Sequence, residues 1–303
     1  LKKKKKTKIF LLDIRKPKIN KKNKNIKYIK CDVRKKINIK FKEKIDLIIN
    51  LAAIHREPGH LSEEYFDTNV EGSKNIVMFA NKNKINNIIF TSSISVYGNK
   101  ILKKNENTKL YPETPYGISK LISEKIFENW QSKNPKKRIL TISRPGVVFG
   151  KEEKGNMERL KNLAKNPFFL FVGNKNTYKA TIYIKELINQ ILWVNLGQKK
   201  KILDSVVIFN STTYPVLKFI EIFEIIRKIQ RTKNFTIEFP FLLILFISYF
   251  IQFFCNLLSI ENKYHPTRIK KLKINNFVEP NFLIKNKYNF KYTHLTAFRE
   301  WID

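Results

Sequence analysis

The amino-acid sequence predicts an α/β fold built on a doubly wound parallel sheet. Short apolar runs alternate with helical patterns through the first two-thirds of the chain, as in proteins whose parallel strands are joined by helices. The runs are almost continuously apolar, which is typical of strands buried on both faces of a sheet. From about Gly150 onward the alternation loosens into helices and irregular basic segments. We therefore expect residues 1–150 to form the sheet domain and residues 151–303 to form mainly a smaller, mixed C-terminal lobe.

Each strand is predicted from one of these apolar runs. In chain order the runs are Ile9–Asp13, Ile26–Cys31, Asp46–Leu51, Ile88–Ser92, Ile139–Arg144 and Val206–Asn210, the last of which returns to the sheet domain. Helical patterns over Glu63–Ala80 and Pro115–Ser132 predict two connecting helices. The second helix has a clear start, because Thr114 can cap it with its hydroxyl and Pro115 suits a first turn. In the lobe we expect Gly155–Met157 in a loop that precedes a helix.

The net charge of the chain is extreme. A value of +35 would ordinarily suggest a nucleic-acid or anionic-membrane partner. However, lysine, asparagine, isoleucine and phenylalanine are all abundant and the lysines are spread along the whole chain, which is the pattern that AT-rich codons produce. The even spread of the lysines therefore argues against a dedicated nucleic-acid partner. The positive charge would still attract a substrate that carries phosphate.

The cysteines and histidines carry little information about chemistry. Cys31 and Cys255 are far apart, and the four histidines form no cluster with metal-ligand spacing. We therefore expect no disulfide scaffold and no metal site. This cysteine usage suits a reducing compartment, so a cytoplasmic location is expected.

One segment of the C-terminal lobe has no formal charge. Phe241–Ile260 is about twenty residues long, which is enough to span a bilayer. The segment also contains polar residues such as Gln252 and Asn256. Three interpretations stay open: a helix packed inside the lobe, a helix at an oligomer interface, or attachment to a membrane surface through residues 241–260.

The most informative residues for chemistry are Tyr116 and Lys120. They are four residues apart in a predicted helix, which puts a phenol and an ammonium on one face. A nearby positive charge favours the phenolate, so we expect the pKa of Tyr116 to fall towards neutrality. Such a tyrosine can take a proton from a sugar or alcohol hydroxyl while a hydride leaves the same carbon. Ser93, at the end of an upstream strand, could hold the reacting oxygen.

Taken in order along the chain, these motifs resemble the extended short-chain dehydrogenase/reductase family, within its nucleotide-sugar epimerase/dehydratase group. The resemblance covers nearly the whole chain and rests on the segments Asn50–His55, Thr68–Gly72, Thr91–Gly98, Tyr116–Lys120 and Ser143–Gly150. It implies a Rossmann-type sheet domain that binds NAD and a substrate-binding lobe. It also implies that Ser93, Tyr116 and Lys120 are catalytic, with Lys120 lowering the pKa of Tyr116 and holding the nicotinamide ribose.

The resemblance extends to the cofactor-binding residues. Asp13 would accept hydrogen bonds from the adenosine ribose, which favours NAD over NADP, although Arg15 and Lys16 nearby weaken that inference. Asp32 would accept from the adenine amino group. The full set implied is Asp13, Asp32, Val33, Leu51, Ala52, Ala53, His55, Asn69, Ser92, Tyr116, Lys120, Arg144, Pro145 and Val147.

The sequence departs from the family at its glycine-rich turn. No GxxGxxG spacing is present among its nine glycines, although such a turn would anchor the cofactor pyrophosphate. Leu1–Thr7 resembles the end of the helix that would follow this turn. We expect that the first strand and the glycine-rich loop are missing through truncation. The alternative is a degenerate protein that no longer binds the cofactor.

The reaction is predicted from one further difference. Dehydratases of this group typically follow the catalytic threonine with an Asp-Glu pair, whereas Ile94 and Ser95 stand here. The resemblance therefore implies an NAD-dependent epimerase that oxidises C4 of a nucleotide-diphosphate sugar transiently, or alternatively an NAD(P)H-dependent 4-keto-sugar reductase. The substrate-binding residues implied are Ser93, Ser95, Asn156, Lys179 and Arg268.

Family members often form homodimers through the helix that carries the Tyr/Lys pair, so the resemblance implies a homodimer.

Two other hypotheses about function remain open at this point. An enzyme of the same chemistry could also act at a membrane surface in polysaccharide biosynthesis. A function of another class would be a non-catalytic nucleotide- or RNA-binding protein on the same fold.

Overall fold

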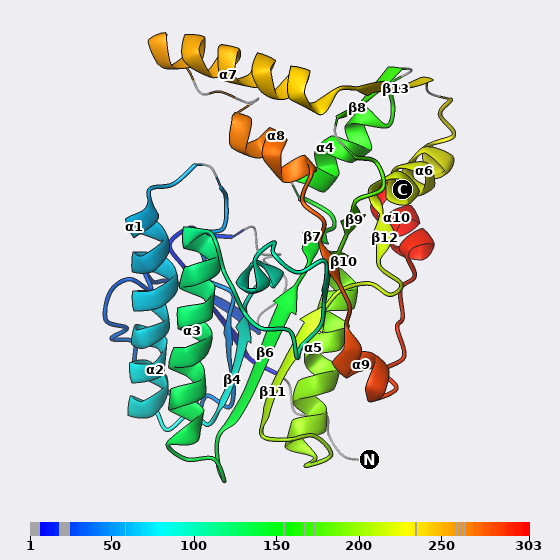
Figure 1. Cartoon of the computed structure of the whole chain (residues 1–303). Helices are drawn as coiled ribbons and strands as arrows, with labels where there is room; N and C mark the ends of the chain where they lie inside the picture. The colour runs from blue at the N-terminus through cyan, green and yellow to red at the C-terminus, as the bar shows by residue number, and fades with distance from the viewer. Residues whose placement is uncertain are drawn as a thin grey trace.

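The protein has an α/β fold with helices on both faces of a parallel sheet (Figure 1). The computed structural model describes residues 7–17, 25–57, 59–153, 155–166, 168–172, 174–233, 235–258, 260, 262 and 265–303. The predicted fold class is confirmed. Most of the expected helix end at Leu1–Thr7 lies outside the described residues.

Four parallel strands form the main sheet in the order β11–β6–β4–β3. Their bounds are Ile48–Asn50 for β3, Asn87–Thr91 for β4, Ile139–Pro145 for β6 and Val206–Ser211 for β11. Each strand lies within one or two residues of its predicted range. Ile88, Ile89, Leu140 and Ile142 are fully buried, as expected of strands that are covered on both faces.

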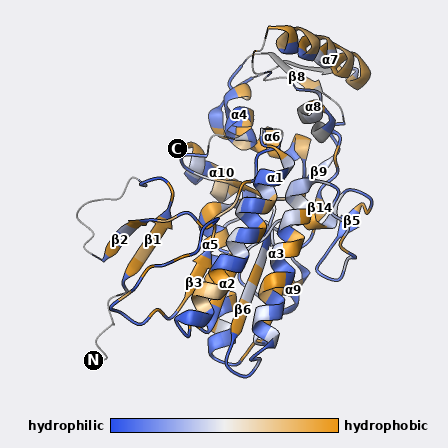
Figure 2. Ribbon diagram, turned by 90° about the vertical axis from the view of Figure 1, so that its left-hand side faces the viewer, coloured by the Kyte–Doolittle hydropathy of each residue, from blue (hydrophilic) through white to orange (hydrophobic). Residues whose placement is uncertain are grey.

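A separate parallel pair stands on the β3 side of the molecule (Figure 2). It consists of β1 (Ile9–Asp13) and β2 (Ile26–Lys30), paired from Ile9 opposite Ile26 to Asp13 opposite Lys30. Within the described ranges, β1 has a hydrogen-bonded neighbour only on its β2 side, and β3 only on its β4 side. Aromatic rings help to join the pair to the body, because Phe41 lies 4.6 Å from Phe10 and 6.1 Å from Phe79 between ring centroids.

Helices cover both faces of the main sheet (Figure 1). One face carries a continuous helical segment with a π-helical turn in its middle. Its elements are α1 (Ser62–Tyr65), η1 (Phe66–Glu71) and α2 (Gly72–Lys82). The next helix along the chain on that face is α3 (Pro115–Ser132). The other face carries α5 (Ile184–Lys199) and α9 (Asn281–Lys285). Aromatic residues such as Phe127 and Trp130 of α3 are buried against Phe90 of β4, and both predicted helices are confirmed.

The C-terminal lobe is built from short strands and helices around an aromatic core. Its strand pairs are β7 (Val147–Phe149) with β10 (Thr181–Tyr183), β8 (Phe168–Val172) with β13 (Phe235–Phe239), β9 (Tyr178–Lys179) with β12 (Leu217–Lys218), and β5 (Lys103–Lys104) with β14 (Phe277–Val278). Its helices are α4 (Asn156–Leu163), α6 (Phe219–Gln230), α7 (Phe241–Leu257), α8 (Pro266–Leu272) and α10 (His294–Ile302). The core includes Phe149, Phe223, Phe298 and Trp301.

Two expectations for the lobe are wrong. Asn156 and Met157 are not in a loop, because α4 begins at Asn156 and Met157 is buried in the lobe core. The apolar segment forms α7, but only Ser248 of this helix is buried, which contradicts the first of its three open interpretations, a helix packed inside the lobe. Figure 1 shows the reason, since α7 lies at the outer end of the lobe with α8 beneath it. Among the described residues, we find no helix with both the length and the apolarity needed to cross a bilayer.

Candidate active site

The candidate site begins where β4 ends. Thr91 is the last residue of this strand, and Ser93 then caps a short 3-10 helix, η2 (Ile94–Tyr97), in an extended backbone conformation. The Ser93 hydroxyl accepts a hydrogen bond from the Ser95 N–H at 3.1 Å and donates to the Ser95 hydroxyl, also at 3.1 Å. Ser93 is therefore held at the carboxyl edge of the sheet, where ligands bind in parallel α/β folds.

Tyr116 reaches this edge from the first turn of α3. Thr114 caps the helix by accepting from the Gly117 N–H at 3.1 Å, as predicted. A Cβ atom at Gly117 would lie only 2.7 Å from the Ser95 carbonyl oxygen, so the start of α3 rests directly on η2. On this side of the sheet edge the Ser93 side chain is near enough to Tyr116 to oppose the rise in the pKa of its phenol.

Replacing Gly117 by alanine should therefore separate the two catalytic candidates. The new methyl group would meet a backbone carbonyl, which cannot rotate away, so we expect a loss of about 1–3 kcal/mol in the unfolding free energy. Gly197→Ala is the matched control, because its Cβ would meet the flexible end of the Leu203 side chain at 2.8 Å. Urea unfolding of both variants tests this, and equal stabilities would show that α3 does not depend on the contact.

Lys120 follows Tyr116 by one helical turn and is buried. Its ammonium lies 4.4 Å from the centre of the Phe90 ring. Burial lowers the pKa of Lys120 to about 7, against an opposing effect of the Glu124 carboxylate. Burial raises the pKa of Tyr116 to about 12, and the charge of Glu57 adds to the rise while the Ser93 hydrogen bond opposes it. The predicted fall in the pKa of Tyr116 is therefore wrong for this structure, because desolvation of the phenol outweighs the favourable contacts.

The pKa of Lys120 has a measurable consequence for stability. Between about pH 7 and pH 10 the unfolded chain binds a proton that the folded protein lacks at this site, so stability rises with pH. Below that window both states bind the proton and the pH dependence from this group vanishes. The stability of the wild type minus that of Lys120→Met should therefore rise from pH 7 to pH 10. Urea unfolding at several pH values measures this difference in unfolding free energy. If the free energies of the two proteins changed in parallel with pH, the lowered pKa of Lys120 would be contradicted.

Asn69 clamps the segment that follows β3 onto α3. Its amide accepts from the Ile54 N–H at 2.9 Å, donates to the Ile54 carbonyl at 3.1 Å and donates to the Ser119 hydroxyl at 2.9 Å. Asn69 lies in the π-helical turn η1, and such turns are frequent at functional sites. The structure thus gives this predicted cofactor residue a positioning role.

Arg144 belongs to a buried polar network. Its guanidinium donates to both Glu124 oxygens, at 2.9 and 2.6 Å, and to the Tyr97 hydroxyl at 3.0 Å. Tyr97 in turn donates to the Asn210 side chain at 2.8 Å. Burial alone would lower the pKa of Arg144, but the hydrogen bonds to Glu124 raise it, so the ion pair is kept. The network joins α3, β6 and β11 behind the site.

The acidic residues predicted for the adenosine end lie at the ends of β1 and β2. The Asp13 carboxylate accepts from the Arg15 N–H at 2.8 Å. Asp32 is held by Arg34, whose guanidinium donates to both its oxygens at 2.7 to 3.1 Å, and this pairing lowers the pKa of Asp32. The next residue, Val33, packs against α2 and its carbonyl accepts from the Asn75 side chain at 2.8 Å.

The remaining predicted cofactor residues lie at or just after the carboxyl ends of β3, β4 and β6 and at the start of β7. Leu51 is exposed, and the Ala52 N–H donates to the Asn50 side chain at 3.1 Å. The pKa of His55 is lowered by partial burial and by the charges of Arg56 and Lys120. The others lie close by in the chain and are Ala53 after β3, Ser92 after β4, Pro145 at the end of β6 and Val147 at the start of β7.

The predicted substrate residues of the lobe are spread over several elements. Asn156 is exposed at the first position of α4. Lys179 of β9 donates to the Ile274 carbonyl at 2.7 Å, and burial lowers the pKa of Lys179 to about 8. Arg268 is part of α8, and its side chain lies outside the described residues. Of this group, the structure brings Ser95 to Ser93 and gives no such contact for the described lobe residues.

A family model described as the 3-beta hydroxysteroid dehydrogenase/isomerase family matches residues 1–233 of the chain. The chain belongs to this family of extended short-chain dehydrogenases/reductases. It is 37% identical over 146 residues to the N-acetyl-alpha-D-glucosaminyl-diphospho-ditrans,octacis-undecaprenol 4-epimerase of Escherichia coli O157:H7, covering 48% of this chain and 44% of the relative. It is 29% identical over 201 residues to an uncharacterised UDP-glucose epimerase of Bacillus subtilis, covering 64% and 62%. The matches thus span less than two-thirds of the length of these curated relatives.

Solved epimerase structures share the fold of this family member. A UDP-glucuronic acid 4-epimerase of Bacillus cereus in complex with NAD aligns with a TM-score of 0.69 at 18% identity, covering 98% of this chain and 89% of the other. A UDP-Glc/GlcNAc 4-epimerase of Campylobacter jejuni aligns with a TM-score of 0.67 at 17% identity, covering 92% and 84%. At these identities the likeness shows the fold.

Two acidic residues of the candidate active site were not identified from the sequence. Glu57 accepts from the Tyr116 N–H at 3.2 Å, and Glu124 pairs with Arg144 and faces Lys120. Glu124 follows Lys120 by four residues, so helical spacing offered a signal. Glu57 lies in a loop without periodicity, and only the tertiary structure places it beside Tyr116.

The residues present fit one end of NAD. The hydroxyl oxygens of Thr91 and Ser92 are buried beside Ser93 and have no hydrogen-bond partner within the described part of the chain. The Ser92 hydroxyl, with Tyr116 and Lys120, suits a nicotinamide ribose, which presents both donors and acceptors. A GxxGxxG turn, which would cradle the pyrophosphate, is not present in the given sequence.

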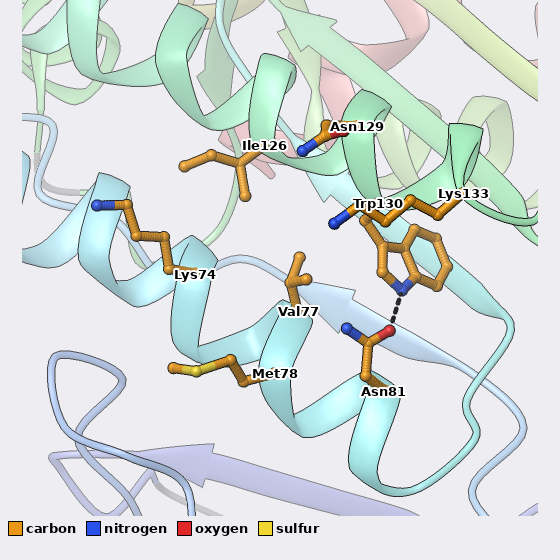
Figure 3. A pocket seen from close by; sticks show the side chains of 8 residues that line it. All are labelled: Lys74, Val77, Met78, Asn81, Ile126, Asn129, Trp130 and Lys133. Atoms are coloured by element: carbon orange, nitrogen blue, oxygen red, sulfur yellow. Dashed lines mark hydrogen bonds between the residues drawn. The ribbon is translucent and has the colours of Figure 1, made fainter.

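A hollow of 310 Å³ between α2 and α3 lies away from these residues (Figure 3). Trp130 in its wall donates to the Asn81 side chain at 3.1 Å. Its α3 side begins at Ile126, which is ten residues and therefore roughly 15 Å along the helix from Tyr116. The hollow is thus separate from the candidate active site.

Proposed function

We propose that the protein is an NAD-dependent 4-epimerase of a sugar linked through a diphosphate, with a nucleotide-diphosphate sugar as the first candidate substrate. The observation that carries this proposal is the packing of the start of α3, with Tyr116 and one turn later Lys120, directly on the η2 turn that Ser93 caps. The family and the epimerases among its relatives support it.

The proposed roles follow from the chemistry of the three side chains. Ser93 would donate a hydrogen bond to the C4 oxygen of the sugar and keep it beside Tyr116. Tyr116 would take the C4 hydroxyl proton as the ketone forms and return it to the same oxygen afterwards. When bound, NAD would accept the C4 hydride and return it to the opposite face of the sugar, so that no atoms are gained or lost.

The protonation states of Tyr116 and Lys120 decide whether Tyr116 can accept a proton when the reaction begins. With a pKa of about 12, Tyr116 keeps its proton at neutral pH and must lose it before it can act as a base. A protonated Lys120 would lower that barrier, because a positive charge favours the phenolate. Since the pKa of Lys120 is about 7, this help is present in a fraction of molecules at neutral pH.

No Asp-Glu pair follows Ser93 in the sequence, which favours epimerisation over dehydration. Ile94 and Ser95 follow Ser93, and the nearby Glu57 accepts a hydrogen bond from the backbone of Tyr116. The same Ser93 and Tyr116 could also deliver a proton to a 4-ketone, so a 4-keto-sugar reductase is the alternative chemistry.

Incubation of the protein with NAD and a UDP-sugar, followed by separation of the C4 epimers, tests the proposal. Epimer formation without net NADH supports it. If the protein instead consumed NADH in the presence of a 4-keto sugar, the epimerase proposal would be wrong and the reductase alternative would be supported. Retention on RNA near 0.2 M salt without NAD binding would favour the non-catalytic binding protein.

A second candidate substrate is a sugar diphosphate carried on a polyprenol. The Escherichia coli relative is named as an epimerase of such a molecule, and α7 presents an apolar surface at the outer end of the lobe. Comparing a UDP-sugar with a polyprenyl-diphosphate sugar in detergent would distinguish the two.

We also propose that a parallel strand and its glycine-rich turn belong between β1 and β3. Support comes from the two separate parallel sheets, each of which has a strand edge without a hydrogen-bonded neighbour in the described residues. The turn would supply the backbone donors that a pyrophosphate needs. Reading the coding sequence upstream of Leu1 tests this, and a stop codon directly upstream without such a motif would instead support a degenerate protein.

A homodimer through α2 and α3 is proposed from the resemblance and from exposed apolar side chains. Met78 of α2 and Ile118 and Ile122 of α3 are exposed on these helices. Light scattering of the wild type and of Ile122→Asp tests the proposal. A wild-type protein that is monomeric at micromolar concentration would overturn it.

A further inference from the structure

The outer face of α7 is the largest feature that the proposed chemistry does not use. Leu242, Phe246, Phe253 and Leu257 are between 64% and 75% exposed. Spacings of four and seven residues place them on one side of the helix. Figure 2 shows α7 as an almost wholly apolar helix at the extremity of the molecule. Exposed apolar surface of this extent marks an interaction site.

The polar residues of α7 lie on a different stripe. Ser248, Gln252 and Asn256 are spaced by four residues. Ser248 is buried, and Gln252 donates to Asn256 at 2.5 Å and accepts from the Asn262 side chain at 2.7 Å. A surface helix in water turns its apolar stripe inward, whereas α7 turns much of its apolar surface outward.

Lysines stand at the edge of this apolar surface. The ammonium of Lys270 lies 5.4 Å from the centre of the Tyr249 ring, and that of Lys273 lies 4.2 Å from the Phe241 ring. Both lysines are exposed. Between residues 239 and 273 the sequence contains a single carboxylate, Glu261. The edge is therefore strongly positive.

We propose that α7 docks flat on a bilayer that contains anionic lipids. Its phenylalanines and leucines would enter the boundary between headgroups and acyl chains, and Lys270 and Lys273 would meet lipid phosphates. The helix has 17 residues and is about 26 Å long, which is short for spanning a hydrocarbon core but long enough to lie in its surface.

Charge decides between a bilayer and a second copy of the chain as the occupant. Two copies that met through this face would bring the same lysines together with almost no carboxylate to pair with them. An anionic lipid surface offers both apolar chains and negative charge. The bilayer therefore satisfies both properties of the face.

The position of α7 also suits a substrate that is attached to a lipid. In Figure 1 the carboxyl end of β6 points towards the lobe, and α7 lies at the far side of that lobe. A bilayer on α7 would thus face the same end of the molecule as Ser93 and Tyr116. The docking proposal itself rests on α7 alone and holds whichever sugar the site binds.

Flotation of the protein with vesicles tests the proposal. The wild type should float with vesicles of phosphatidylglycerol and phosphatidylcholine, and less with phosphatidylcholine alone. Phe246→Glu combined with Phe253→Glu should lower vesicle partitioning by at least about tenfold, because two aromatic side chains no longer enter the lipid. Lys270→Gln combined with Lys273→Gln should weaken binding to the anionic vesicles by about tenfold or more and leave the neutral vesicles unaffected.

The control replaces exposed apolar residues elsewhere. Leu196→Glu combined with Ile202→Glu changes two side chains that are 54% and 74% exposed on and just after α5, and it should float as the wild type does. Failure of the wild type to bind anionic vesicles would overturn the proposal. So would an α7 variant that still floats but changes from dimer to monomer in light scattering. NAD binding and epimer formation in vesicle-free buffer report separately on the proposed function.

Discussion

Tyr116→Phe is expected to lower the kcat for epimerisation by about 10²–10⁴-fold, the usual contribution of a general acid–base residue. The substitution keeps the ring that packs 6.4 Å from the Tyr65 ring and removes only the hydroxyl proposed to transfer the proton. The unfolding free energy should therefore change little. Initial rates of epimer formation at saturating substrate measure the effect.

Tyr111→Phe is the matched control for this experiment. Tyr111 is exposed, and its ring lies under the ammonium of Lys100 at 3.6 Å, a contact that phenylalanine keeps. The control should retain the wild-type kcat. A Tyr116→Phe variant as active as this control would refute the proposed proton transfer.

Glu124→Leu is expected to give the largest loss of stability, about 3–5 kcal/mol in the unfolding free energy. The change leaves the Arg144 guanidinium buried without its carboxylate partner, because Arg144 is 4% exposed. Replacing both partners, as Glu124→Leu with Arg144→Met, should recover much of the loss, since no guanidinium is then buried without its carboxylate. Urea unfolding of the single and double variants measures both effects.

Glu128→Leu on the same helix is the control for the buried ion pair. Glu128 forms a pair with Lys125 at 2.6 Å, but the lysine side chain is 65% exposed. Such surface pairs contribute at most about 1 kcal/mol. If Glu124→Leu were no more destabilising than this control, the network behind the site would not support the fold.

The sheet and the Tyr/Lys helix were predictable because their signals are local. The helix over Pro115–Ser132 begins and ends where the sequence predicts, since a capping hydroxyl and a proline define its start within a few residues. Four-residue spacing within that helix also places Lys120 one turn from Tyr116. Continuous apolar runs predicted the buried strands for the same reason.

The roles of Asn69 and Arg144 were not predictable in this way. Both match family positions for cofactor binding, yet the structure engages Asn69 with Ile54 and Ser119, and Arg144 with Glu124. Each of these partners lies on a segment that no local spacing relates to Asn69 or Arg144. Hydrogen-bond partners across 15 to 50 residues become known only when the chain is folded.

By itself, the sequence determined the α/β class, the position of the strands along the chain and the helix that places Tyr116 and Lys120 one turn apart, because these depend on periodicity and spacing over short stretches. The tertiary structure alone decided how strongly the Tyr116 and Lys120 pKa values are shifted, since burial depends on every element packed around them. It also decided that α7 turns its apolar residues outward, because a helix without charges reads the same whether its neighbours cover it or leave it exposed.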